Sequence, residues 1–290
     1  MYQTVRGLTI RTVDYKEADQ ILTILTDTRG CLTVKARGVR RKGSRLKAAA
    51  QLFTFSQMTL YEQKGRATLH DAEILQQFPG LQTDLTKLAL ASYLAEVLGT
   101  EAEDAPAEGE ILRLALNCLY ALSNDLCSPV VIKAAFELRY MLLAGYSPDL
   151  SVCTVCGTPH PVRPVAMLEA GTVRCQSCNV PGNTGKQMPL SVSALEAARY
   201  ILSCDLKKLF SFQLPEDDLR RLGAVCEAYL LAGMERGFRT LDFYKSVGET
   251  LLHYRKSRLR PLNCRRFWNC WQQKQRPRRQ RSFVDSFGRK

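Results

Sequence analysis

Residues 153–178 read CTVCGTPHPVRPVAMLEAGTVRCQSC. This stretch contains two Cys-x-x-Cys pairs, Cys153 with Cys156 and Cys175 with Cys178, separated by 18 residues (157–174). This spacing is typical of a four-cysteine zinc site, in which each tight turn presents two thiolates to one ion. Four thiolates leave no open position for water or substrate, so we expect a structural zinc ion. The alternative is two chance pairs of reduced core cysteines in a chain with 11 cysteines.

The residues around the two pairs favour the metal site. Gly157 follows the first pair and Asn179 follows the second, and both residue types suit tight turns. The segment between the pairs is rich in Pro, Val and Thr, which predicts a short hairpin that the ion would hold together.

Composition indicates a soluble protein of a reducing compartment. The chain has 290 residues, 46% of them hydrophobic and 24% charged, enough for one large or two to three small domains. No apolar secretory signal begins the sequence, and no apolar run is long enough to span a membrane. Cys118, Cys204 and Cys226 fall inside apolar helical patterns, as buried free thiols do. We therefore expect the cytoplasm, with association to the nucleoid.

Charge is concentrated at the two ends of the chain. Residues 1–80 carry 13 Lys or Arg against 7 Asp or Glu, and residues 249–290 carry 13 against 2. The middle of the chain is slightly acidic, while the whole chain has a net charge of +13. This distribution indicates a polyanionic partner, of which nucleic acid is the commonest.

Residues 1–80 have the pattern of a small β-barrel. Alternating or β-rich runs, separated by turn residues, predict five strands at residues 5–13, 20–25, 31–36, 52–61 and 67–75. Five short strands in about 75 residues fit an OB-type barrel. An SH3-like barrel or a separate meander remains an alternative.

A basic segment lies between the third and fourth predicted strands. It has seven cations and no carboxylate in 13 residues: Lys35, Arg37, Arg40, Arg41, Lys42, Arg45 and Lys47. Gly38 and Gly43 would let the backbone approach a phosphate chain, so these cations are our candidate nucleic-acid ligands. The alternative is a flexible solvated loop. The candidates for base stacking are few: Tyr15, Tyr61, Phe53 and Phe55. Phe53 and Phe55 are at least as compatible with a position in the core.

From Leu81 the hydrophobic period changes to that of helices. The stripes predict packed amphipathic helices at residues 84–99, 111–123, 129–145, 193–202 and 215–236, with an acidic loop at 101–110. Ser128 before Pro129 is a helix N-cap, and Ser193 with Glu196 forms a capping box. We therefore predict a helical domain over residues 81–247, interrupted by a zinc finger at about 150–180.

After Val247 aliphatic residues become scarce. Arg and Lys are mixed there with aromatic residues that include Phe267, Trp268 and Trp271. Such a segment buries too little surface to fold alone, so residues 248–290 are predicted to be a disordered basic tail. The tail would add phosphate contacts and some base stacking, or it is a dispensable extension.

Over residues 1–247 the chain resembles the RecO family of bacterial recombination mediators. The resemblance is carried by residues 5–12 with 19–25, by the turn at 36–38 leading into residues 40–46, and by the segment ELRYMLLAGYSP at 137–148 running into the cysteine pairs. It implies an N-terminal OB domain and a helical C-terminal domain with a zinc finger. The tail has no counterpart in the family pattern.

The resemblance also implies a function. Family members bind single- and double-stranded DNA and anneal complementary strands. With RecR as a partner, they help to load RecA onto strands coated by single-strand DNA-binding protein, whose acidic C-terminal tail is a contact. We therefore expect a mediator that is not an enzyme, in keeping with the absence of a Walker motif in the sequence.

Two other classes of function remain as alternatives. One is a zinc-containing regulator that reads a specific DNA sequence through its helical part. The other is a zinc-dependent nucleic-acid-modifying enzyme, but His160 lacks the following glutamate and Arg174 replaces the proline that a base deaminase motif requires.

Overall fold

The computed structural model describes residues 1–100, 109–179 and 185–257, with side chains through residue 248. The chain divides into two units, Met1–Val247 and Gly248–Lys290. Most of the predicted acidic loop at 101–110, and the tail from residue 258 with its aromatic residues, lie outside the described residues.

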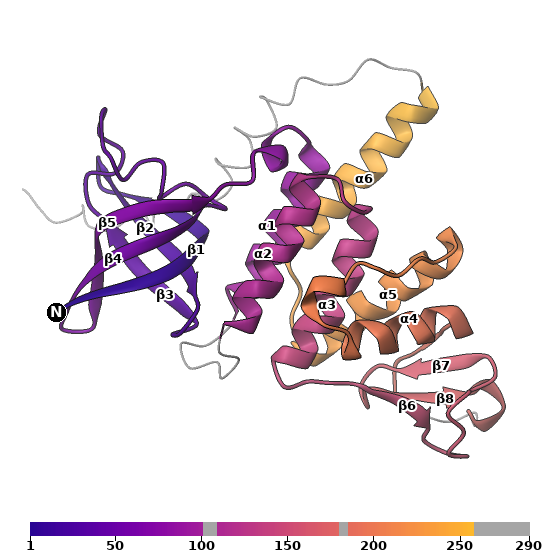
Figure 1. Ribbon diagram of the computed structural model, residues 1–290. Helices are drawn as coiled ribbons and strands as arrows, with labels where there is room; N and C mark the ends of the chain where they lie inside the picture. The colour runs from indigo at the N-terminus through magenta and orange to yellow at the C-terminus, as the bar shows by residue number, and fades with distance from the viewer. Residues whose placement is uncertain (101–108, 180–184, 258–290) are drawn as a thin grey trace, which may run out of the picture. The chain divides into compact units, whose positions relative to one another are not determined.

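A closed five-stranded barrel forms the N-terminal part (Figure 1). Its strands are β1 (Tyr2–Tyr15), β2 (Asp19–Thr26), β3 (Cys31–Ala36), β4 (Phe55–Gln63) and β5 (Arg66–Gln76). The strand order is β1-β2-β3-β5-β4, and pairing of β1 with β4 closes the barrel. All of these pairs are antiparallel except β3 with β5. The predicted OB-type barrel is confirmed.

Alternation of side chains builds the barrel interior. Inward positions are filled by aliphatic residues that are almost fully buried, among them Leu22, Ile24, Val34, Met58 and Leu60. Because successive side chains of a strand point to opposite faces, the intervening residues form the outer surface of the barrel.

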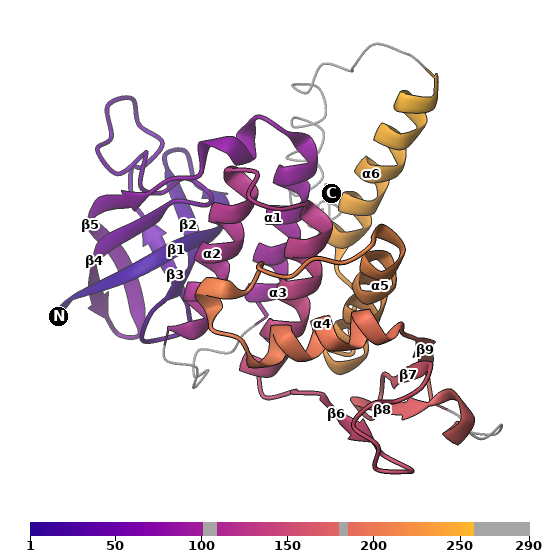
Figure 2. The same ribbon diagram turned by 45° about the vertical axis from the view of Figure 1, so that its right-hand side comes forward.

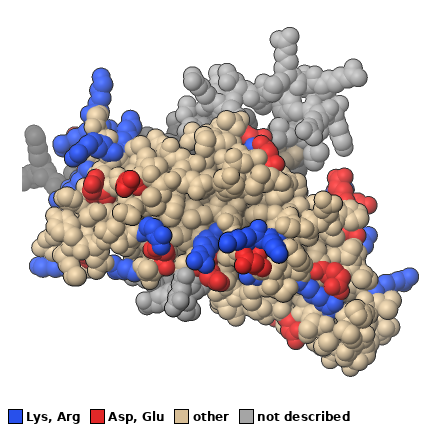
Figure 3. Space-filling model, viewed as in Figure 1, with Lys and Arg blue, Asp and Glu red and all other residues tan. Residues whose placement is uncertain are grey.

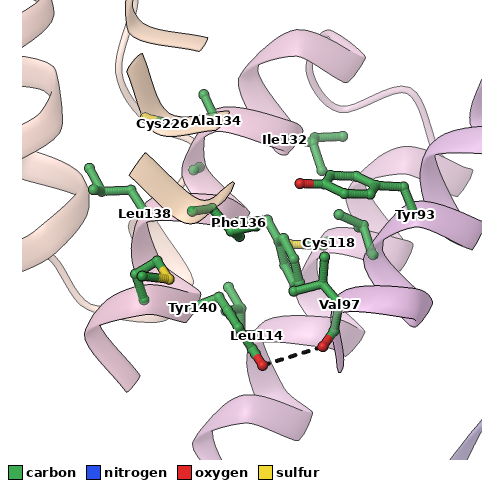
Figure 4. Packing of buried hydrophobic residues seen from close by; sticks show 14 of the residues in the cluster. Tyr93, Val97, Leu114, Cys118, Ile132, Ala134, Phe136, Leu138, Tyr140 and Cys226 are labelled. Carbon is green, nitrogen blue, oxygen red and sulfur yellow. Dashed lines mark hydrogen bonds between the residues drawn. The ribbon is translucent and has the colours of Figure 1, made fainter. Parts of the chain in front are cut away.

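The helical part follows the short 3-10 helix η1 (Pro79–Gln82). Its helices are α1 (Leu85–Leu98), α2 (Glu110–Ser123), α3 (Pro129–Leu143), α4 (Val192–Ser203), α5 (Glu216–Gly233) and α6 (Arg239–Ser257), with η3 (Leu206–Lys208) between α4 and α5. Large side chains of α1, α2 and α3 interlock in the core, where the Tyr140 hydroxyl donates a hydrogen bond to the Val97 carbonyl (Figure 4).

The barrel and the helices share this core. Leu8, Ile10 and Phe53 of the barrel belong to the same buried cluster as Leu94 and Leu98 of α1. The thiol of Cys31 also donates a hydrogen bond to the carbonyl of Leu98. The two parts therefore pack as one hydrophobic unit.

The cysteine segment forms a small sheet next to α4 (Figure 2). It contains β6 (Asp149–Cys153), β7 (Pro164–Met167), β8 (Thr172–Cys175) and β9 (Gln187–Pro189), in the order β6-β8-β7-β9, and η2 (Gln176–Cys178) follows β8. The predicted hairpin between the cysteine pairs is present as antiparallel β7 and β8.

Helix boundaries differ from the predictions in two places. The N-cap of α4 is Ser191, whose hydroxyl accepts a hydrogen bond from the Ala194 amide, while Ser193 bonds to Asp218 of α5 instead. Either serine could cap the helix, and the contact of Ser193 with Asp218 leaves Ser191 as the cap. Helix α6 (Arg239–Ser257) was not predicted, and it makes residues 248–257 helical where we expected disorder. None of the described helices is long and apolar enough to cross a membrane.

Candidate nucleic-acid interface and metal centre

The basic segment between β3 and β4 is anchored to the barrel. Val39 and Ala50 are buried in the barrel core, and Leu46 packs against that core. Backbone hydrogen bonds also hold the segment, including a long-range one from the Arg40 amide to the Ala18 carbonyl, between β1 and β2. Lys and Arg side chains gather at the upper left in Figure 3, where this segment projects from the barrel in Figure 1. The segment therefore presents its cations from a fixed base.

Asp19 holds the start of this segment. One carboxylate oxygen accepts a hydrogen bond from the Gly38 amide at 2.8 Å, and the other lies 3.1 Å from the Lys35 ammonium. The Gly38 hydrogen bond, with a smaller contribution from Lys35, lowers the pKa of Asp19. Gly38 has a φ of +61°, a backbone conformation that favours glycine at this turn.

Most of the predicted cations lack an acidic partner. Lys35 is paired with Asp19, and Arg40 lies 3.4 Å from a carboxylate oxygen of Asp14. The other five predicted cations are exposed and form no ion pair within the described residues: Arg37, Arg41, Lys42, Arg45 and Lys47. Exposed and unpaired cations are the groups that can bind phosphate without first breaking an internal ion pair.

Two of the four aromatic candidates are core residues. Phe53 is buried with a φ of +60°, which turns its ring into the core shared with the helices, and Phe55 packs partly against the same core. Tyr15 and Tyr61 are exposed. The Lys35 ammonium lies 4.9 Å from the centroid of the Tyr15 ring, a cation–π contact.

Sequence reasoning missed two further aromatic residues on the outside of the barrel. The ring centroid of Tyr2 lies 5.1 Å from that of Tyr61 and 5.1 Å from that of His70. Tyr2 is paired with Tyr61 in the register of β1 and β4. Only the register could have revealed this group, because the three residues are far apart in the sequence.

The four predicted metal ligands come together. The Sγ atoms of Cys153, Cys156, Cys175 and Cys178 all lie within 4.8 Å of one another, and those of Cys156 and Cys175 are 3.8 Å apart. Zinc–sulfur bonds of about 2.3 Å in a tetrahedron require sulfur–sulfur distances of about 3.8 Å. The four thiols can therefore hold one metal ion, in a site closed by protein ligands.

Backbone amides favour the thiolate at the first cysteine. Burial by itself raises the pKa of Cys153, but hydrogen bonds from the amides of Cys156, Cys175 and Val155 outweigh it and lower the pKa to about 6. The amide of Cys175 donates to the Cys153 sulfur at 3.3 Å. A thiolate is the form of cysteine that binds metal, so these backbone amides favour the metal-binding form of Cys153.

Arg199 of α4 connects the metal centre to the helices. Its guanidinium donates to the carbonyl oxygens of Leu150 (2.8 Å), Ser151 (2.8 Å) and Pro159 (2.9 Å). These carbonyls flank the first cysteine pair on both sides. One side chain therefore fixes the loop that carries Cys153 and Cys156.

A buried ionic network joins α3 to α1 and α5, and the apolar helix pattern gave no sign of it. The Lys133 ammonium lies 2.7 Å from Glu137 Oε1 and 2.8 Å from Glu227 Oε2. The Tyr93 hydroxyl donates to Glu137 at 2.7 Å, and Lys245 of α6 pairs with Glu227. Glu137 is fully buried, and its Oε2 accepts no hydrogen bond among the described residues. The network reaches the surface through Lys245, whose side chain is 48% exposed.

The fold and these two sites define a class of protein, an OB-type barrel with a basic rim joined to a helical domain that carries four cysteines placed to hold a metal ion. Comparison with known families agrees with this class. Residues 1–78 match the family described as Recombination protein O N terminal, and residues 82–242 match Recombination protein O C terminal. The chain belongs to the RecO family of DNA repair proteins.

Whole-length relatives support the same assignment. The chain is 31% identical over 247 residues to the DNA repair protein RecO of Acetivibrio thermocellus, which covers 85% of this chain and 97% of that protein. The RecO protein of Desulforudis audaxviator is 32% identical over 248 residues, with coverage of 85% and 97%. That of Symbiobacterium thermophilum is 29% identical over 248 residues, with coverage of 84% and 96%. A role in recombinational repair follows from this membership.

Proposed function

We propose that this protein is a recombination mediator that holds DNA strands by their phosphates, anneals complementary strands and helps to load RecA. The observation that carries the proposal is the anchored basic segment with its five unpaired cations. Membership of a DNA repair family supports DNA as the polyanion.

Neutralisation of phosphate is the proposed physical basis of annealing. Two complementary strands repel each other through their backbones, and bound Lys and Arg side chains reduce that repulsion. Base pairing then supplies the free energy of annealing, so the protein needs no bond-making chemistry. Arg37, Arg41, Lys42, Arg45 and Lys47 are the proposed phosphate ligands, with Lys35 and Arg40 positioned by acidic partners at the base of the segment.

Zinc is the proposed occupant of the four-cysteine centre. Thiolate sulfur, tetrahedral spacing and a closed site all fit structural zinc. Because the ligands lie on β6, β8 and the turns that follow these strands, the ion would hold the small sheet together. We assign it no role in chemistry.

The protein partners follow from the family resemblance. We propose that RecR and the acidic C-terminal tail of single-strand DNA-binding protein are direct partners, and that RecA is an indirect one. The site of action would be the nucleoid. No described residue is assigned to these protein contacts.

The salt dependence of DNA binding tests the basic segment. In an R41A/K42A variant, the affinity for single-stranded DNA should fall, and the slope of log K against log salt should decrease by about 1.4 if both side chains contact phosphate. A K207A/K208A variant, which removes two exposed lysines at η3, is the matched control and should keep the full slope. An unchanged slope in the first variant would exclude these two residues from the interface.

An annealing assay tests the function itself. Complementary strands coated with single-strand DNA-binding protein should anneal faster when this protein is added, without nucleotide hydrolysis. Failure to anneal coated or bare strands at any salt concentration would refute the mediator role.

A further inference from the structure

A continuous row of outward side chains runs round the outside of the barrel. In the strand registers Tyr2 is paired with Tyr61, Tyr61 with Thr68, Thr68 with Lys35, Lys35 with Ile21, and Ile21 with Val13. Directly paired residues lie on the same face of a sheet. The row therefore joins strands β1, β4, β5, β3 and β2, and it passes through Lys35 at the base of the basic segment.

One end of this row is an aromatic platform, which we define as Tyr2, Tyr61 and His70. The ring of Tyr2 contacts those of Tyr61 and His70, and the exposed fractions of Tyr2 and Tyr61 are 58% and 36%. Exposed aromatic rings held together on rigid strands are the groups on which unpaired bases stack. No described element covers them.

Cations lie on two sides of the platform, at the β4–β5 turn and on β3. Lys64 and Arg66, in and beside the β4–β5 turn, are exposed and form no ion pair within the described residues. Lys35 lies two strands away from Tyr61, which corresponds to about 10 Å. Exposed acidic residues on β5 are Asp71, which directly follows His70, and Glu73, so the cations near the platform lie toward the β4–β5 turn and β3.

We propose that this platform stacks the bases of a DNA single strand whose phosphates continue onto the basic segment. The inference rests on the proposed DNA-binding function and adds a base-contacting subsite to it. This subsite lies on β1, β4 and β5, whereas the oligonucleotide-binding site typical of OB folds is formed by the second and third strands with the β1–β2 and β4–β5 loops. The two sites would meet at the β4–β5 turn. Because every base has an apolar face, stacking would be independent of sequence, as a mediator acting on any strand requires.

The proposal predicts a base-dependent part of the affinity. Fluorescence anisotropy with the full-length protein would compare a 20-nucleotide oligo(dT) with an abasic chain of equal length and charge. Y61A and Y2A should each weaken binding of oligo(dT) by roughly tenfold and leave binding of the abasic chain unchanged. Y61F, which keeps the ring, should behave as wild type.

A tyrosine elsewhere provides the matched control. Tyr120 of α2 is 49% exposed and lies outside the platform, so Y120A should retain wild-type affinity for both probes. Photocross-linking to oligonucleotides that carry 5-iodouracil should place adducts on Tyr2, Tyr61 or His70.

The outcomes separate this inference from the proposed function. Unchanged oligo(dT) affinity in Y61A and Y2A, equal loss for both probes, or adducts confined to other segments would each overturn the platform while leaving phosphate binding by the basic segment in place. If wild-type protein binds neither probe at low salt, the proposed function fails and the platform with it.

Discussion

Glu137 is the residue whose surroundings depart most from those of an ordinary glutamate. Burial raises its pKa to about 7, although Lys133 and the Tyr93 hydroxyl lower it in part. Burial also disfavours the charge on Lys133, but the two neighbouring carboxylates outweigh this effect and raise the pKa of Lys133. The lysine therefore stays charged while Glu137 titrates near neutrality.

This shift predicts a pH dependence of stability. Between about pH 4.5 and 7 the folded protein binds a proton at Glu137 that the unfolded chain has lost, so the free energy of unfolding should decrease as pH rises through this window. E137Q cannot titrate and should remove this part of the slope. Urea unfolding of the wild-type protein and of E137Q at pH 5, 6, 7 and 8 measures how the free energy of unfolding changes with pH. Parallel curves for the two proteins would contradict the assignment.

A metal ion bound by the four cysteines would hold the strands of the cysteine sheet in place. C175S removes one ligand of the cluster and should reduce bound zinc from about one ion per chain to nearly none, with a lower melting temperature. C204S, at a half-buried cysteine outside the cluster, should keep both values near wild type. Elemental analysis and thermal denaturation provide the two readings. Full zinc content in C175S would show that the cluster is not the binding site.

Elements were predictable where a local pattern determined them, and not where a tertiary contact did. The cysteine spacing predicted that the four thiols come together, and Ser128 before Pro129 predicted the start of α3. Ser191 and Ser193 are equally good caps in sequence, but the bond from Ser193 to Asp218 leaves capping to Ser191. The cations of the basic segment could be identified from sequence, although their role in binding DNA stays a prediction.

At the scale of the whole molecule, the residues that connect distant strands and helices were beyond sequence reasoning. Tyr2 joins Tyr61 and His70 only through the pairing of β1 with β4, which brings together residues far apart in the sequence. Lys133 and Glu137 lie in the helix predicted at 129–145, but nothing in the sequence indicated that they pair inside the bundle. Phe53 appeared to continue a strand, but its backbone turns the ring into the core.

The core shared by barrel and helices predicts how residues 1–247 unfold. Leu8 lies in the shared core and Leu22 in the barrel interior, and both are fully buried. L8A and L22A should each destabilise the protein by about 3 kcal/mol and shift one common transition. Calorimetry would show this as a single peak. A second peak that only L22A moves would mean that the barrel unfolds by itself.

The guanidinium of Arg199 has a consequence for how long a metal ion stays bound. Its bonds to the Leu150, Ser151 and Pro159 carbonyls brace the strand and loop that must open before a chelator can reach the sulfurs. An R199K variant offers one donor atom in place of this fork, so zinc should escape to a competing chelator faster, even though every ligand is intact. The residence time of the ion would then be set by a side chain of α4 that never touches it.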